Sequence, residues 1–179
     1  MKREEFEHVI RAAADVVDDE IVVAGSQAVL GQFPDAPASL LRSLEVDVFP
    51  KHAPERAAEI DGAIGDGSRF HEAFDYYAPG IGPETIVAPA GWEGRLIRLE
   101  LLAVARKSRT AVAWCLEVHD LVLAKLAAGR PHDLGFAQDA LAEGLVNLER
   151  LRLGIDLMPS RHRERTRTRL EGIRRKARS

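Results

Sequence analysis

Hydrophobic and polar positions alternate with different periods along the chain, and each period predicts an element. Apolar residues at positions 6, 9, 10, 13, 16 and 17 recur with a helical period, which predicts a helix over residues 6–17 that packs against a sheet. The β-branched run over residues 21–24 predicts a short buried strand. Over residues 44–49, apolar and acidic residues alternate, which predicts a second strand with Glu45 and Asp47 on one face.

The rest of the chain continues this mixture of helix and strand. Further elements are predicted as a helix over 54–64, strands over 84–88 and 95–102, and helices over 117–129 and 134–145. The fold class is therefore α/β, of the α+β kind, with a small mixed β-sheet flanked by helices and a C-terminal helical region. We expect a core over residues 1–115 and a helical region over 116–179 within one compact domain.

Size and composition support a single domain and exclude several classes of protein. A chain of 179 residues with 46% hydrophobic residues forms one core of ordinary size. It has neither an apolar run of about 18 residues nor a signal-peptide pattern, so we expect a cytoplasmic protein without a membrane span. Cys115 is the only cysteine and lies in an apolar stretch, which indicates a buried, inert thiol.

Charge divides the chain into an acidic body and a basic tail. Residues 150–179 carry 11 Lys or Arg against 3 Asp or Glu, although the whole chain has a net charge of −3. Such a tail suits nucleic-acid phosphates, but no aromatic side chains interleave with its arginines to stack bases. A solvated terminal helix, or one docked on the acidic body of its own chain or of a second copy in a homodimer, is the alternative.

Aromatic residues concentrate between the predicted strands. Residues 68–82 contain Phe70, Phe74, Tyr76 and Tyr77, four of the eight Phe or Tyr residues of the chain. Core packing or a lid is the simplest interpretation, and a base-stacking platform is the alternative.

Candidate chemistry begins where the first predicted strand ends. Gly25 ends this strand, and Ser26 is placed to cap a following helix, whose unpaired backbone N–H groups suit a phosphate. Glu45 and Asp47, about 7 Å apart on one strand face, can share Mg²⁺. Taken alone, Gly25-Ser26 can be a common turn, and Glu45 and Asp47 can lie on the solvated face of an edge strand. Together they indicate phosphoryl transfer.

Two charged residues in the helical region add to this site. Lys125 interrupts an apolar helix, where its ammonium needs a phosphate, a carboxylate such as Glu45 or Asp47, or a path along the helix to solvent. Asp133 is either the N-cap of the next helix or a catalytic carboxylate. Glu100, on the strand predicted over 95–102, is the other candidate for a third carboxylate, with a solvent-facing glutamate as the alternative.

The first motif resembles the nucleotidyltransferase superfamily, whose signature is a hydrophobic strand, Gly-Ser, a short helix and then Asp-x-Asp or Asp-x-Glu on the next strand. Glu45 stands where Asp is usual. A second motif resembles the AbiEii-type nucleotidyltransferases of bacterial toxin-antitoxin systems; its positions are Asp120, Leu121, Lys125, Leu126, Ala128, Arg130 and Asp133. The resemblance implies that Lys125 contacts the triphosphate, that Asp133 assists catalysis, and that Ser43 and Arg130 belong to the nucleotide site. It also implies an antitoxin as a partner.

The predicted activity is transfer of a nucleoside monophosphate from an NTP to a hydroxyl of RNA, such as tRNA, or of a protein. Glu45 and Asp47 would hold Mg²⁺, Gly25 and Ser26 the triphosphate, and Glu45, Asp47 and Asp133 would form the catalytic carboxylates. Two other classes stay open. One is a non-catalytic nucleotide-binding relative in which Glu45 has weakened metal binding, and the other is a nucleic-acid-binding or antitoxin-like protein that uses the Arg-rich tail.

Overall fold

A computed structural model describes residues 1–102 and 110–176 and shows a mixed α+β fold. Within these residues, one four-stranded sheet has the order β2-β1-β4-β3. The strands are β1 (Ile21–Val23), β2 (Val48–Pro50), β3 (Ile97–Leu101) and β4 (Ala111–Cys115). The central pair, β1 and β4, is parallel, and each edge strand is antiparallel to its neighbour. The predicted fold class is confirmed.

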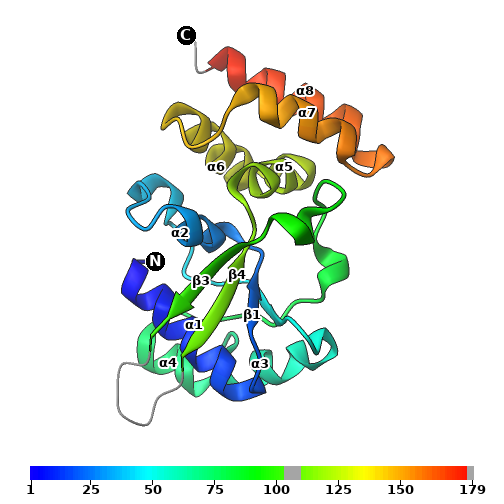
Figure 1. The fold of residues 1–179 in the computed structure, drawn as a ribbon. Coiled ribbons are helices and arrows are strands. Elements are labelled where there is room, and N and C mark those ends of the chain that lie inside the picture. The colour runs from blue at the N-terminus through cyan, green and yellow to red at the C-terminus, as the bar shows by residue number, and fades with distance from the viewer. Residues whose placement is uncertain (103–109, 177–179) are drawn as a thin grey trace.

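Helices lie in two groups around this sheet (Figure 1). The first half of the chain contributes α1 (Arg3–Val17), α2 (Val29–Gln32), α3 (Ala57–Ile64) and α4 (Arg69–Phe74). The second half contributes α5 (Val118–Ala128), α6 (Pro131–Ala142), α7 (Leu148–Leu157) and α8 (Ser160–Lys176). The second group lies together beyond the carboxyl end of β4 (Figure 1).

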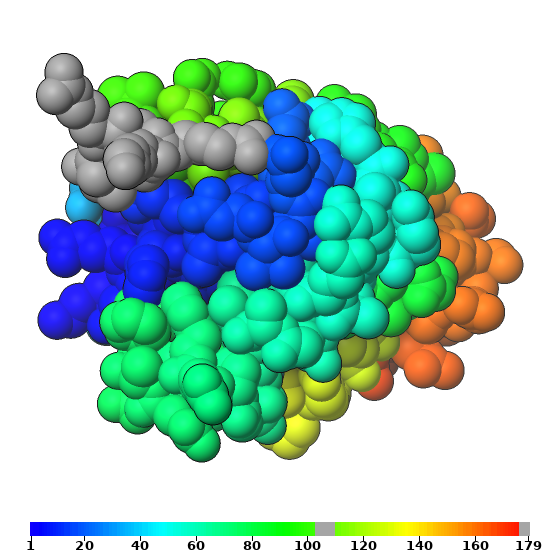
Figure 2. Space-filling view, turned by 90° about the horizontal axis from the view of Figure 1, so that it is seen from below, coloured from blue at the N-terminus to red at the C-terminus, as the bar shows by residue number. Residues whose placement is uncertain are grey.

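The opposite end of the molecule is formed by the first half of the chain. Figure 2 views this end: blue α1 lies beside the cyan and green segments that follow β2, and orange C-terminal residues appear only at the edge. Helix α1 buries Phe6, Val9, Ile10, Ala13 and Val17, the stripe that its periodicity predicted. Among the described residues, no helix combines the length and apolar character required to cross a membrane.

Several predicted elements differ from the observed ones. The strand expected over residues 44–49 is wrong in extent, because β2 begins only at Val48 and Glu45 pairs in an isolated bridge with Tyr77. The strand expected over 84–88 is also wrong. Pro83–Thr85 forms a 3-10 turn, for which proline at the first position is well suited. Strand β4 was not predicted, although it lies beside β1 at the centre of the sheet.

The aromatic segment packs on α1. The rings of Phe70, Phe74 and Tyr76 surround His8, with centroids 4.6–5.9 Å from its ring. Phe70 and Tyr76 pack against the core, as expected, whereas Phe74 is 44% exposed and covers His8 from the surface. Tyr77 lies elsewhere, beside Glu45. Cys115 is fully buried, and its burial raises the pKa of the thiol to about 12, in agreement with an inert thiol.

The basic tail is docked on its own chain as far as the structure describes it, to residue 176. Helix α8 contacts α5, α6 and α7, and it buries Thr166, Leu170 and Ile173. The Arg169 guanidinium donates to the carbonyls of Leu126 and Ala127, at 2.6 and 2.8 Å, at the C-terminal end of α5. Of the alternatives for the tail, the helix docked on its own body is the one observed.

Candidate active site

Gly25 and Asp47 lie in direct contact at the ends of two neighbouring strands. Gly25 follows β1 and Asp47 precedes β2, and the Ala24 N–H donates to the Asp47 carbonyl at 3.0 Å. A Cβ atom on Gly25 would lie 1.9 Å from Oδ2 of Asp47, far inside van der Waals contact. Only glycine therefore allows the carboxylate to rest against the backbone of this turn.

Ser26 starts the turn that follows. Residues Ser26–Ala28 form a 3-10 helix whose cap residue is Gly25, and no side chain caps it. The prediction that Ser26 is an N-cap is therefore wrong by one residue. The error has a physical reason: the chain bends directly at Gly25, so Ser26 already has a helical backbone. Its side chain borders the same cavity as Ser43, Glu45 and Asp47.

Glu45 is held beside Asp47 by Tyr77. The Tyr77 hydroxyl donates to Oε2 of Glu45 at 3.1 Å, and the Val46 N–H donates to the Tyr77 carbonyl at 3.0 Å. The Ser43 hydroxyl accepts a bond from the Glu45 N–H at 3.2 Å. Glu45 and Asp47 therefore face one cavity even though the segment that carries them is an irregular strand.

Asp47 sits in an environment that disfavours its negative charge. Burial raises the pKa of this carboxyl above its ordinary value, and the nearby Glu45 raises it further. Lys125 and Arg130 act in the opposite direction but do not cancel these effects. A cation bound between Asp47 and Glu45 would relieve this unfavourable charge.

Lys125 is paired with Asp133, not with Glu45 or Asp47 as suggested from the sequence. Its Nζ lies 3.0 Å from Oδ1 of Asp133, and Nε of Arg130 lies 2.7 Å from Oδ2. Asp133 is fully buried, and despite the opposing effect of burial these two cations hold the pKa of its carboxyl below the ordinary value. Asp133 is the third residue of α6, whose cap position is Arg130, so the N-cap interpretation of Asp133 is wrong.

Two cavities meet at this cluster and share the side chains of Asp47, Lys125 and Arg130. The polar chamber, of about 480 Å³, is otherwise bordered by groups that include Ser26, Arg42, Ser43, Glu45, His132 and Asp139. The apolar chamber, of about 330 Å³, is bordered by Gly25 and by residues that include Ile81, Ile86, Val87, Leu121, Ala128 and His162. All eight residues predicted for the site therefore border one chamber or the other.

Glu100 is not among them. It lies exposed on the edge strand β3, where its Oε2 is 2.9 Å from Nη1 of Arg98. The solvent-facing alternative for Glu100 is the observed one.

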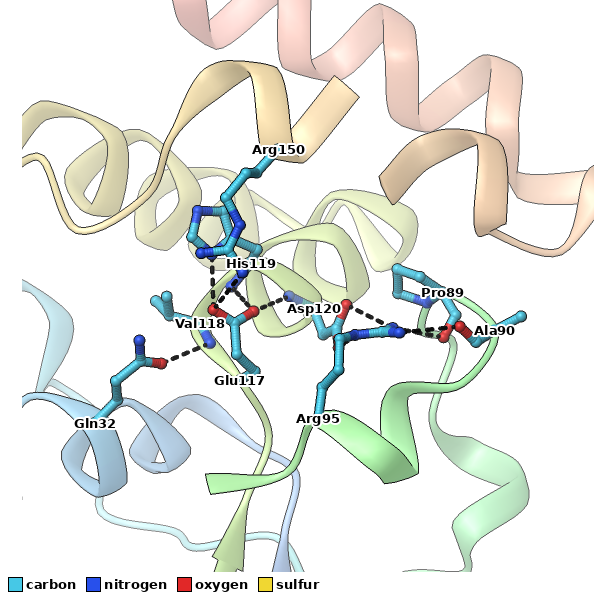
Figure 3. A network of polar contacts seen from close by, with 9 residues as sticks. All are labelled: Gln32, Pro89, Ala90, Arg95, Glu117, Val118, His119, Asp120 and Arg150. Atoms are coloured by element: carbon cyan, nitrogen blue, oxygen red, sulfur yellow. Dashed lines mark hydrogen bonds and ion pairs between the residues drawn. The ribbon is translucent and has the colours of Figure 1, made fainter. Parts of the chain in front are cut away.

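Asp120, the first position of the second motif, fixes helix α5 to the 3-10 turn Trp92–Arg95 that precedes β3. Its carboxylate accepts two bonds from Arg95, at 2.8 and 3.1 Å, and Arg95 also donates to the carbonyls of Pro89 and Ala90 (Figure 3). Glu117 caps the helix by accepting the His119 and Asp120 N–H groups. Because α5 carries Lys125, this network determines where Lys125 enters the site.

Among the residues that border or support the site but were not predicted are Tyr77, His132 and His162. In the sequence, Tyr77 directly follows Tyr76 and reads as one more member of the aromatic cluster. No local pattern shows that its hydroxyl reaches Glu45 instead. His132 and His162 belong to no metal-binding spacing, so the sequence gives no reason to single them out. A histidine in the Arg-rich tail gave no signal by itself, because only the docking of α8 brings it to the chamber.

The fold is α+β, and its mixed sheet places a glycine-serine turn against two carboxylates, with a buried lysine nearby. This arrangement is expected of a nucleotidyltransferase. Residues 3–174 match the model of the family described as "Nucleotidyltransferase of unknown function (DUF6036)", and the chain belongs to this family. Comparison with curated proteins and with solved structures finds no significant match. The predicted superfamily is confirmed, and the AbiEii-type subgroup stays a prediction.

Proposed function

We propose that this chain transfers a nucleoside monophosphate from an NTP to a hydroxyl group of RNA or protein in the cytoplasm. The proposal rests on the contact between Gly25 and Asp47. A side chain at position 25 would collide with the Asp47 carboxylate, so glycine at this turn keeps the carboxylate in place. An aspartate without a function would not require a glycine in the neighbouring turn.

The donor set suits magnesium. Mg²⁺ is commonly held by one or two carboxylates, and substrate phosphates and water complete its octahedron. Glu45 and Asp47 provide the two carboxylates, and no group of three His, Cys, Asp or Glu side chains within the described residues forms a complete metal cage. When bound, Mg²⁺ would offset the negative charge of the phosphates.

The side chains of the polar chamber have complementary tasks in this proposal. Ser26 and Ser43 offer hydroxyl donors to the triphosphate, and Lys125 and Arg130 offset its charge. Asp133 holds these two cations in place, since both of its oxygens face them. The acceptor oxygen bonds to the α-phosphorus while the bond to pyrophosphate breaks, and the hydroxyl proton leaves to water. Such a displacement depends mainly on position and charge.

The test is incubation with each α-labelled NTP, Mg²⁺ and total tRNA, followed by a search for label in RNA or protein. Asp47→Asn should abolish transfer with little change in folding. Glu100→Gln is the matched control, because it neutralises an exposed carboxylate on the far edge of the sheet and should transfer normally. Magnesium-dependent NTP binding without any transfer would instead support the non-catalytic relative.

A further inference from the structure

The two chambers on either side of Asp47 differ in chemistry. We propose that the apolar chamber holds the nucleobase of the donor NTP, and that α8 supplies His162 as a residue that determines base specificity. This inference rests on the proposed function, because it takes the polar chamber as the site of the triphosphate.

The polar chamber is the one suited to phosphates. Besides the shared Lys125 and Arg130, it is bordered by the hydroxyl residues Ser26, Ser39 and Ser43, by the cationic Arg42 and by His132. The apolar chamber adds no Lys, Arg or serine to the shared pair, and Glu45, the second carboxylate proposed for magnesium, does not border it. A triphosphate with its magnesium would therefore find fewer partners there.

An uncharged, planar ligand fits the apolar chamber better. Ile81, Ile86, Val87 and Leu121 provide apolar surface, and a volume of about 330 Å³ is at the small end of ligand pockets in proteins. The shared residues Asp47, Lys125 and Arg130 form its inner border. Because a base and its triphosphate belong to one molecule, a base compartment must adjoin the phosphate site, as this chamber does.

His162 adds a polar group to the apolar surroundings. Its Nε2 accepts a bond from Nε of Arg161 at 3.0 Å, so the proton of the neutral ring is on Nδ1. Burial, together with Arg161, Arg165 and Arg169, lowers the pKa of His162, which favours this neutral ring. Nδ1 is buried and has no hydrogen-bond partner among the described residues. A turn of the ring toward the apolar chamber would let Nδ1 donate to an acceptor atom on the edge of a base.

A residue at the end of α5 allows a test with little risk to folding. Ala128 is exposed and borders the apolar chamber, so Ala128→Trp should obstruct the chamber without disturbing the core. We would titrate each variant with NTPs and with inorganic tripolyphosphate, both in the presence of Mg²⁺. Ala128→Trp should weaken NTP binding by about tenfold or more and leave tripolyphosphate binding unchanged, since only the NTP carries a ring to bury. Ala128→Ser is the matched control and should bind both as the wild type does.

His162→Ala is the second variant. It should change the ratio of affinities among the four NTPs by about threefold or more, with tripolyphosphate binding unaltered. Equal effects on both ligands, or none on NTPs in both variants, would overturn the base compartment and leave the proposed function standing. If the wild type binds neither NTP nor tripolyphosphate, the proposed function and this inference both fail.

Discussion

Asp47 and Asp133 are two carboxylates in one site with opposite electrostatic surroundings. Asp47 is next to Glu45 and has a raised pKa, whereas Asp133 is fully buried between Lys125 and Arg130 and has a lowered pKa. An added cation would stabilise the ionised form of Asp47, whereas Asp133 already has two cations beside it. In the proposed function, Asp47 is therefore the group assigned to the metal, and Asp133 is the group that positions the two cations.

Breaking the Lys125–Asp133 pair should destabilise the fold. Lys125→Met leaves buried Asp133 with Arg130, whose side chain is 63% exposed, so we expect a loss on the order of 3 kcal/mol in the free energy of unfolding at pH 7. Lys125→Met/Asp133→Leu should lose less than the sum of the two single variants. Additive losses in urea unfolding would contradict the pairing.

The same pair predicts a pH dependence. Because folding lowers the pKa of Asp133, its ionised form stabilises the protein above the ordinary value of 3.8, and this stabilisation disappears as pH falls through the folded pKa. The gap in unfolding free energy between the wild type and Asp133→Asn should therefore be full at neutral pH and shrink on acidification below about pH 4. A gap that widens on acidification would show that Asp133 is protonated in the folded protein.

Tyr77 should act on magnesium through Glu45. Tyr77→Phe removes the hydroxyl that orients Glu45, and loss of such a partner typically weakens metal binding by about tenfold or more. Tyr76→Phe is the control, because the Tyr76 hydroxyl pairs with Nδ1 of His8, at 2.8 Å, in the aromatic cluster. Mg²⁺ titration in the presence of a non-hydrolysable NTP measures the effect. Equal Mg²⁺ affinities in the two variants would remove Tyr77 from the site.

Helix α5 connects the sheet to the helical region. Its N-terminus is held by Glu117 and by the Asp120–Arg95 pair (Figure 3). Its C-terminal end is held by Arg169. Asp120→Asn should reduce the free energy of unfolding by about 1–2 kcal/mol, since it weakens a buried, charge-assisted pair. Glu149→Gln, which breaks an exposed pair with Arg152, should cost at most about 0.5 kcal/mol. Equal losses in chemical denaturation would mean that Asp120 is not an anchor.

Periodicity predicted α1, because this helix buries a regular stripe, and the β-branched run predicted β1, which is buried at each of its three positions. It failed for residues 44–47, whose backbone pairs with Tyr77 in an isolated bridge, a contact that no local pattern encodes. It also passed over β4, whose five residues alternate in burial beside β1. At the site, the motifs identified Gly25, Asp47 and Lys125, but the partner of Lys125 and the approach of His162 depend on how the helices dock.

For the molecule as a whole, α8 is a structural element as well as a basic surface. Leu170→Ala should cost about 3 kcal/mol because the side chain is fully buried between helices. Leu153→Ala, on the neighbouring α7, removes a side chain that is 69% exposed and should change stability by at most about 0.5 kcal/mol. Thermal unfolding compares them, and similar melting temperatures would contradict the docked helix. Binding of RNA, an antitoxin or a second copy by the tail stays a prediction. Point variants test it better than deletion of α8, because deletion would expose the core.

The central claim is that the Gly25–Ser26 turn and Asp47 form one site for an NTP with magnesium. Calorimetric titration of a non-hydrolysable NTP, with Mg²⁺ and with EDTA, tests it most directly when the wild type is compared with Gly25→Ala. The added methyl must displace the Asp47 carboxylate, whereas in the control Gly62→Ala it meets no atom within 4 Å. We predict magnesium-dependent binding in the wild type and in Gly62→Ala, and its loss in Gly25→Ala and in Asp47→Asn. Binding that is independent of magnesium, or equally tight in folded Gly25→Ala, would contradict the account.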